Sequence, residues 1–229
     1  MKVHFGGIVM RLRIAILCAS LCAASADAGA WLREQGTGFA ATSTGVTDQF
    51  NAQNGFYLEY GLTAGTTVGL DIDMRLTQAG QSGSGHVFAR RALPFGGKGV
   101  WAYQIGLGAA FQDVAVTPLA KLGLSYGRGI KLGKYDGWLA VDSAAQWDFG
   151  TSVRSLKVDT TAGLTFNEHS KAMVQLFWTA DSLGTSSATL TPSYVYTPER
   201  GRFSYVVGVE AIRGRSERYG IKLGLWSDF

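Results

Sequence analysis

Cysteine is almost absent from this chain, and its only two cysteines lie near the N-terminus. Cys18 and Cys22 both fall within the first 28 residues, which we expect to be removed as a signal peptide. The remaining chain would then hold no cysteine, which excludes disulfide bonds, thiolate metal sites and a cysteine nucleophile. Its stability would have to come from backbone pairing and burial.

The first 28 residues have the three parts of a secretory signal. Basic residues precede an apolar stretch that is too short to span a bilayer, and a small-x-small motif for signal peptidase follows it. These parts are Lys2, Arg11 and Arg13, then the stretch 14–24, then Ala26-Asp27-Ala28. A leucine precedes each cysteine where a lipoprotein signal needs a small residue, so lipid attachment is not expected. We predict a signal peptide at residues 1–28 and a mature domain at residues 29–229.

Long apolar runs and clusters of one charge are also missing from residues 29–229. No run approaches the roughly 18 residues that a membrane helix needs. Removing Lys2, Arg11, Arg13 and Asp27 from the chain's 21 basic and 17 acidic residues leaves 18 and 16, which are scattered singly. Such a balance, without a basic patch, argues against a nucleic-acid partner. If the protein lies in a membrane, it must cross as a β-barrel.

What the sequence does contain is strict alternation, clearest in the stretch Gly55–Leu76. Apolar residues stand at every second position on both sides of Thr63–Thr66, and the positions between them are polar or glycine. Period two predicts two strands of a hairpin with one wholly apolar face. The pattern recurs along most of the chain with no helix to cover it. We therefore predict an all-β fold, a transmembrane antiparallel up-and-down β-barrel that is apolar outside and polar inside.

The alternation predicts about twelve strands, an even number that places both termini on the periplasmic side. Besides the hairpin, the predicted strands are Glu34–Thr44, His86–Leu93, Val100–Gln112, Pro118–Gly127, Gly137–Asp148, Val153–Thr165, Lys171–Ala180, Ser187–Thr197, Arg202–Ile212 and Arg218–Phe229. Two polar stretches, Gly45–Asn54 and Thr77–Gly85, are expected to be long outer loops, and Arg128–Asp136 a long periplasmic turn. Arg90 would face inward and Arg91 would reach the headgroups.

Aromatic residues on the predicted outward face gather near the strand ends, as in the two girdles of membrane barrels. They are Tyr60, Tyr103, Tyr126, Phe166, Tyr196, Phe203 and Phe229 toward one interface, and Phe56, Phe111, Trp147, Trp178 and Tyr219 toward the other. Strands are rich in aromatic residues in any protein. The mid-strand outward positions, however, are mostly aliphatic, which favours girdles.

The C-terminus carries the most specific pattern. The chain ends at Phe229, and apolar residues stand at alternate positions back to Tyr219. This resembles the last strand of Gram-negative outer-membrane β-barrel proteins, which implies recognition of Phe229 by the barrel assembly machinery and contact with outer-membrane lipids. Ser227 departs from the family's usual second aromatic residue. The Gly-Ala-Trp start and the block Tyr57–Thr63 also resemble a porin-like proteobacterial family of outer-membrane proteins, a likeness that supplies no activity.

The predicted lumen is lined by charges of both signs. The candidate lining residues are Glu59, Asp71, Asp73, Arg75, Arg90, Lys121, Asp142, Lys157, Asp159 and Lys222. These charges either pair into a salt-bridged plug, since buried charges need partners, or line a narrow hydrophilic channel. No ring of a single sign stands out, so the sequence predicts no ion selectivity.

Catalytic and metal chemistry have little support. His169 falls in a predicted turn, and His86 follows Ser82-Gly83-Ser84-Gly85 at the predicted outer end of its strand, without a nearby acidic partner. Asp71 and Asp73 are better explained as a lumen pair than as a protease dyad or half a calcium site. We expect no catalytic residues, no metal and no cofactor.

Three functions follow, all in the outer membrane. We predict a narrow porin-like channel for small hydrophilic solutes. The alternatives are a non-conducting barrel that acts through its surface loops, in polysaccharide export or adhesion, and an enzyme that modifies outer-membrane lipids at the rim. A soluble secreted β-sandwich is the competing fold. The sequence predicts neither the solute nor an oligomeric state.

Overall fold

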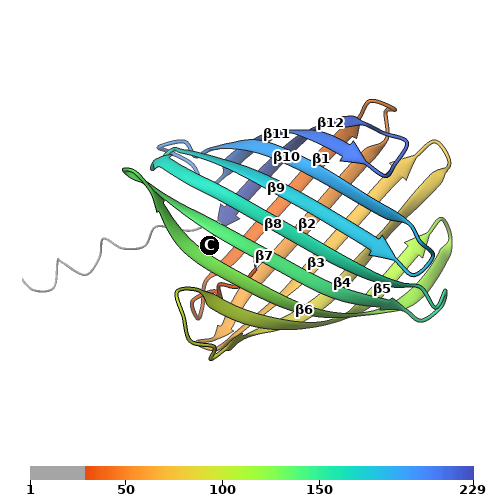
Figure 1. Ribbon diagram of the computed structural model, residues 1–229, viewed down its shortest axis with the longest axis horizontal. Coiled ribbons are helices and arrows are strands. Elements are labelled where there is room, and N and C mark those ends of the chain that lie inside the picture. The colour runs from red at the N-terminus through yellow and green to blue at the C-terminus, as the bar shows by residue number, and fades with distance from the viewer. Residues whose placement is uncertain (1–28) are drawn as a thin grey trace, which may run out of the picture.

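The computed structural model describes residues 29–229, and the predicted signal peptide lies outside the described residues. Twelve antiparallel strands form one closed barrel, in which consecutive strands pair and β1 closes on β12 (Figure 1). They are β1 (Gly38–Thr47), β2 (Ala52–Thr63), β3 (Thr66–Thr77), β4 (Gly80–Leu93), β5 (Val100–Gln112), β6 (Ala115–Leu132), β7 (Tyr135–Asp148), β8 (Arg154–Asn167), β9 (Ser170–Asp181), β10 (Ser186–Tyr196), β11 (Ser204–Arg213) and β12 (Tyr219–Asp228). The predicted fold is confirmed, and the single closed sheet excludes a β-sandwich. No helix within residues 29–229 is long and apolar enough to cross a membrane.

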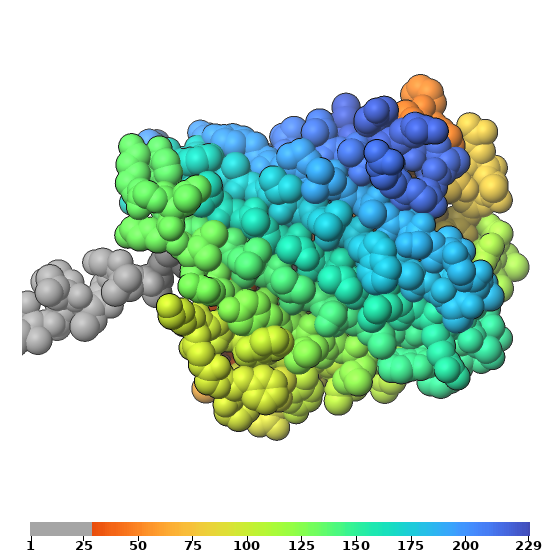
Figure 2. Space-filling model, in the orientation of Figure 1, coloured from red at the N-terminus to blue at the C-terminus, as the bar shows by residue number. Residues whose placement is uncertain are grey.

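The alternation of side chains in β2 and β3 separates the two faces of the wall. Leu62 and Leu76 point outward and are more than half exposed, whereas Glu59 and Thr67 point inward and are fully buried. Aliphatic and aromatic side chains cover the outside of the other strands in the same way. Figure 2 shows one flank, covered by side chains from the green-to-blue half of the chain. An apolar outside is what a lipid-facing barrel requires, since hydrocarbon offers backbone groups no partners and a closed wall leaves no edge.

The turns are shorter than the sequence suggested, so three loop predictions are wrong. The connections are residues 48–51, 78–79 and 133–134, because β1, β4 and β6 extend further than expected. The Gly- and Ser-rich segment before His86 belongs to β4. Ser82 of this segment borders the polar cavity, and Gly83 leaves room for the ring of Phe111 on the neighbouring strand. Polar, small residues therefore mark the lumen face of a strand here, where the sequence suggested a loop.

The first predicted strand is also displaced. Strand β1 begins at Gly38, and residues 29–37, which we call the arm, turn inward to the lumen. Gly36 adopts a positive φ of 86°, which an L side chain rarely tolerates, and this allows the turn. The backbone of Gly36 donates to the carbonyl of Gly61, and Gly61 donates to the carbonyl of Thr37, both at 2.9 Å. A side chain at Gly61 would overlap the carbonyl of Glu34, so this close approach needs glycine.

The closing pair has reciprocal backbone hydrogen bonds between Gly38 and Phe229, at 2.6 and 3.0 Å. We call this end of the barrel, on the left in Figure 1, the terminal end and the opposite one the loop end.

The ladder between β10 and β11 skips Thr191 and Pro192, although Pro192 still pairs with Val174 of β9. Proline has no N–H to donate, so the ladder toward β11 is interrupted.

Candidate functional site in the lumen

The barrel encloses a polar cavity of about 510 Å³. Nine of the ten residues that the sequence placed in the lumen border it, and their side chains come from six strands. They are Asp71, Asp73, Arg75, Arg90, Lys121, Asp142, Lys157, Asp159 and Lys222. Glu59, the tenth, is fully buried beside Arg90. Glu210 and Arg215 also border the cavity and add one charge of each sign.

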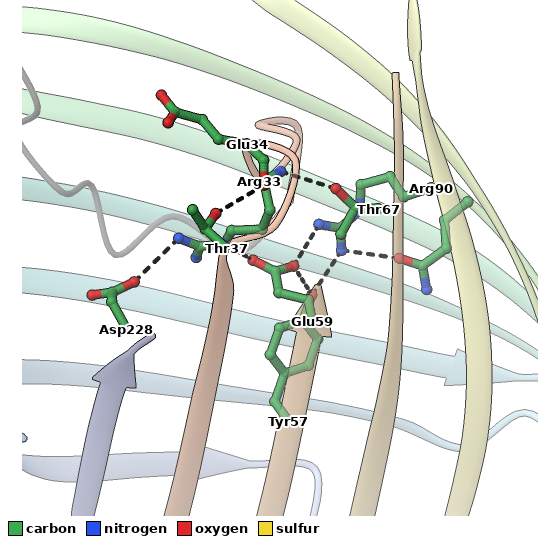
Figure 3. Close-up of polar contacts among 9 residues, drawn as sticks. Arg33, Glu34, Thr37, Tyr57, Glu59, Thr67, Arg90 and Asp228 are labelled. Carbon is green, nitrogen blue, oxygen red and sulfur yellow. Dashed lines mark hydrogen bonds and ion pairs between the residues drawn. The ribbon is translucent and has the colours of Figure 1, made fainter. Parts of the chain in front are cut away.

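At the terminal end, Glu59 is held between two arginines (Figure 3). One carboxylate oxygen binds Nε of Arg33 from the arm, and the other accepts from Nη1 of Arg90 at 3.0 Å and from the hydroxyl of Tyr57 at 2.6 Å. Arg90 also donates to Tyr57 and Gln104, at 2.9 and 3.0 Å. Charge-assisted hydrogen bonds of this kind are the strongest in proteins. This cluster closes one part of the lumen as a paired, buried network.

Aromatic rings surround the two arginines. The guanidinium of Arg33 lies 4.6 Å from the ring centre of Phe39, and that of Arg90 lies 5.2 Å from the ring centre of Phe88. Both rings are buried and face inward. Cations over ring faces are attracted by the ring quadrupole, so these contacts hold both guanidiniums in place.

A second cluster lies further along the lumen and includes His86. Nζ of Lys121 lies 3.1 Å from Nε2 of His86 and 3.4 Å from a carboxylate oxygen of Asp71. His86 is in the middle of β4 with 3% of its surface exposed. The predicted position of His86 at the outer rim is therefore wrong. The hypothesis of a rim enzyme relied on this histidine as its candidate catalytic residue and is no longer supported by it. His169 lies in the turn between β8 and β9, as predicted.

Seven of the charged residues that border the cavity have no ion-pair partner within 4 Å among residues 29–229. They are Asp73, Asp142, Lys157, Asp159, Glu210, Arg215 and Lys222. One carboxylate oxygen of Asp159 is buried without any hydrogen-bond partner. Asp73 on β3 and Lys157 on β8 interact electrostatically across the lumen. Charges that are not directly paired need water, so the central part of the cavity is suited to hydration.

The arm crosses the lumen at the terminal end. Arg33 fixes it to the β2 and β3 wall, where its backbone N–H donates to the hydroxyl of Thr67 at 2.9 Å. Trp31 lies on the opposite side, where its ring covers Gly127 of β6 and packs against the buried cluster of Trp138, Met173, Val195 and Val206. Gly29 reaches the cavity itself. The arm therefore narrows the lumen from one wall to the other.

The loop end is tied by a third cluster. Glu217, in the connection between β11 and β12, is buried and binds Arg75 and the side-chain amide of Asn51. Burial opposes its ionisation, but the hydrogen bonds from Arg75, its own backbone and Asn51 prevail and lower the pKa of Glu217 to about 2. Burial and the neighbouring Arg75 lower the pKa of Arg215. These contacts fasten the first connection to the last.

Sequence reasoning missed Arg33, Trp31 and Glu217. Arg33 and Trp31 fall outside any alternating stretch, and Glu217 lies in a turn, so period two carries no signal for them. Trp31 belongs to the Gly29-Ala30-Trp31 start of the predicted mature chain, but nothing in this short stretch of sequence indicates that the chain turns inward. Within residues 29–229, no group of three or more His, Cys, Asp or Glu side chains is arranged to hold a metal ion.

No protein-family model and no curated protein matches this sequence. Solved structures do match the fold. The KdgM porin has a TM-score of 0.60 at 10% identity, over 83% of this chain and 99% of that chain. An outer membrane channel from Pseudomonas putida F1 has a TM-score of 0.57 at 10% identity, over 89% and 98%. LpxR from Salmonella typhimurium has a TM-score of 0.55 at 8% identity, over 82% and 99%. At such identities the likeness concerns the fold, and this chain has the closed β-barrel fold of Gram-negative outer-membrane proteins.

Proposed function

We propose that this protein is a narrow outer-membrane channel for small hydrophilic solutes. The observation that carries the proposal is the polar cavity of about 510 Å³, with both signs of charge on its walls. A structural plug would pair these charges, because an isolated buried charge is costly. Asp73, Asp142, Lys157 and Asp159 are not paired within 4 Å in the described part of the chain, which favours a hydrated path.

A solved structure with a similar fold supports the proposal that the solute is polar. The KdgM porin has been solved in complex with disordered oligogalacturonate, a polymer that a hydrophilic lumen can accept. The lumen of this chain, in contrast to a lining of one charge, mixes acidic and basic residues in nearly equal number. Such a lining favours weak charge selection and a preference set by size.

The arm favours a second candidate, a barrel that is closed until the arm moves. Trp31 and Arg33 attach the arm to opposite walls at the terminal end. In the first candidate, water and solute pass beside the arm. In the second, the arm blocks the path, and the connections at the loop end would carry the activity.

Conductance in planar bilayers tests the proposal. The protein would be extracted from outer membranes in detergent, and its folding checked by heat-modifiable gel mobility. The variants Asp73→Asn and Lys157→Gln remove cavity charges of opposite sign. Asp136→Asn serves as the control, because Asp136 lies at the exposed start of β7 and pairs only with exposed Lys131, at 3.6 Å.

We expect discrete conductance steps in the wild-type protein. The reversal potential in a salt gradient should shift toward anions in Asp73→Asn and toward cations in Lys157→Gln, with Asp136→Asn unchanged, because fixed charges on a narrow wall set ion preference. Steps that appear only after residues 29–34 are deleted would establish the arm-closed barrel. If neither the folded wild-type protein nor the folded variant lacking residues 29–34 gives conductance steps, the proposal of a channel is refuted.

A further inference from the structure

The arm brings its first described residue against a carboxylate inside the barrel. If a side chain were built on Gly29, its Cβ would lie 2.6 Å from both carboxylate oxygens of Asp142. The Cβ and the backbone nitrogen are bonded to the same Cα, so the nitrogen of Gly29 lies within about 5 Å of these oxygens. Gly29 and Ala30 are buried, so this contact is shielded from bulk water.

Asp142 lacks a close counter-charge from the barrel wall. Its direct neighbour across the ladder is Asp159 on β8, another carboxylate, and like charges directly opposite each other are unfavourable. Ser125 gives Asp142 a hydrogen bond, and Arg90 and Lys121 act on it only over a longer distance. No ion pair of Asp142 within 4 Å is found in residues 29–229. A cation placed beside Asp142 would therefore be stabilised.

Signal-peptide removal would supply that cation. The predicted cleavage after Ala28 converts the backbone nitrogen of Gly29 from a neutral amide into an ammonium group. We propose that the processed protein begins at Gly29 and that its α-ammonium binds the Asp142 carboxylate inside the lumen. Asp142 is then the acceptor site for the new amino terminus, and processing completes the attachment of the arm. This inference rests on the predicted cleavage and does not depend on conduction.

Together with Arg33, the proposed pair would anchor the arm at two points. Arg33 binds Glu59 on one wall, and the Gly29 ammonium would bind Asp142 on the other wall, where Trp31 also packs. An uncleaved chain has no charge at Gly29 and would leave Asp142 beside Asp159 without a cation at ion-pair distance. The arm of the precursor would therefore be held less firmly than that of the mature protein.

Amine labelling of the folded, processed protein tests the proposal. Purified protein in detergent would be treated with an amine-reactive acetylating reagent, denatured, digested with trypsin and analysed by mass spectrometry. Because Arg33 is the first tryptic site after Ala28, the amino terminus is reported by the peptide 29–33. Lys98, in the exposed connection between β4 and β5, serves as the internal reference for a free amine.

We expect the first peptide to begin at Gly29, and its α-amine to be acetylated at least about tenfold faster in Asp142→Asn than in wild type, because the buried ion pair protects the amine. Asp142→Glu should retain much of the protection, and Asp136→Asn, on the same strand but exposed, should match wild type. Heat-modifiable mobility confirms that each variant is folded. An amino terminus at another residue, or equal labelling in wild type and folded Asp142→Asn, would overturn the proposal.

Discussion

Replacing Glu59 with alanine should destabilise the barrel more than any single change at an exposed charge. Glu59 is fully buried, and the side chains of its partners Arg33 and Arg90 are only 13% and 4% exposed. The change leaves both guanidiniums and the hydroxyl of Tyr57 without their shared acceptor. Removing one partner of a buried ion pair costs about 3–5 kcal/mol of unfolding free energy. Glu59 has two arginine partners, but Arg33 keeps its pair with Asp228, so we expect the loss to stay within this range.

Urea unfolding in detergent micelles, followed by tryptophan fluorescence and by heat-modifiable mobility, measures this loss. Glu34→Ala is the matched control, because Glu34 belongs to the same arm but its side chain is exposed and points away from the cluster (Figure 3). Combining Glu59→Ala with Arg90→Met should cost less than the sum of the two single changes, since residues of one network are coupled. A Glu59→Ala variant within about 1 kcal/mol of wild type would show that the cluster is hydrated and that the reasoning is wrong.

Two further predictions concern the loop end and the interrupted ladder. The pKa of Glu217 is lowered from 4.5 to about 2, so its contribution to stability is present above pH 4.5 and is lost as the pH falls toward 2. Glu217→Gln should therefore unfold in less urea than wild type at pH 7, with the gap closing near pH 2, and a gap independent of pH would contradict this. Pro192→Thr restores an N–H between β10 and β11, so we expect a gain of about 0.5–1.5 kcal/mol in unfolding free energy, and a loss of stability would show that the proline fits a bend the strand requires.

The sequence was sufficient to predict the wall of this barrel, because alternation is a local property. Strand Val100–Gln112 was predicted with the bounds that the structure has, and Glu59, Asp71 and Arg90 were assigned to the inward face. Side chains on the same face of a strand recur at every second residue, so the alternation of apolar and polar residues identifies the two faces of each strand. The count of twelve then followed from the number of such stretches.

Turns and the interior could be predicted less well, because they depend on long-range contacts. Residues Thr77–Gly85 look like a loop by composition, and only the pairing of β4 with β5 shows that most of them form a strand. The inward course of the arm depends on Trp31 meeting side chains from β7, β9, β10 and β11. Nothing near Trp31 in the sequence specifies those partners, so the sequence wrongly predicts the start of a strand at Glu34–Thr37.

The seam between β1 and β12 sets the order in which this chain can fold. Every other pairing joins consecutive strands and can form as soon as a hairpin is made, whereas this one joins residues separated by nearly the whole barrel. Closing a long loop carries the larger entropic cost, so the seam should be the slow step. Arg33 lies 3.3 Å from Asp228 of β12 as well as against Glu59 of β2. It therefore acts as a latch that can engage both strands only after the seam has closed.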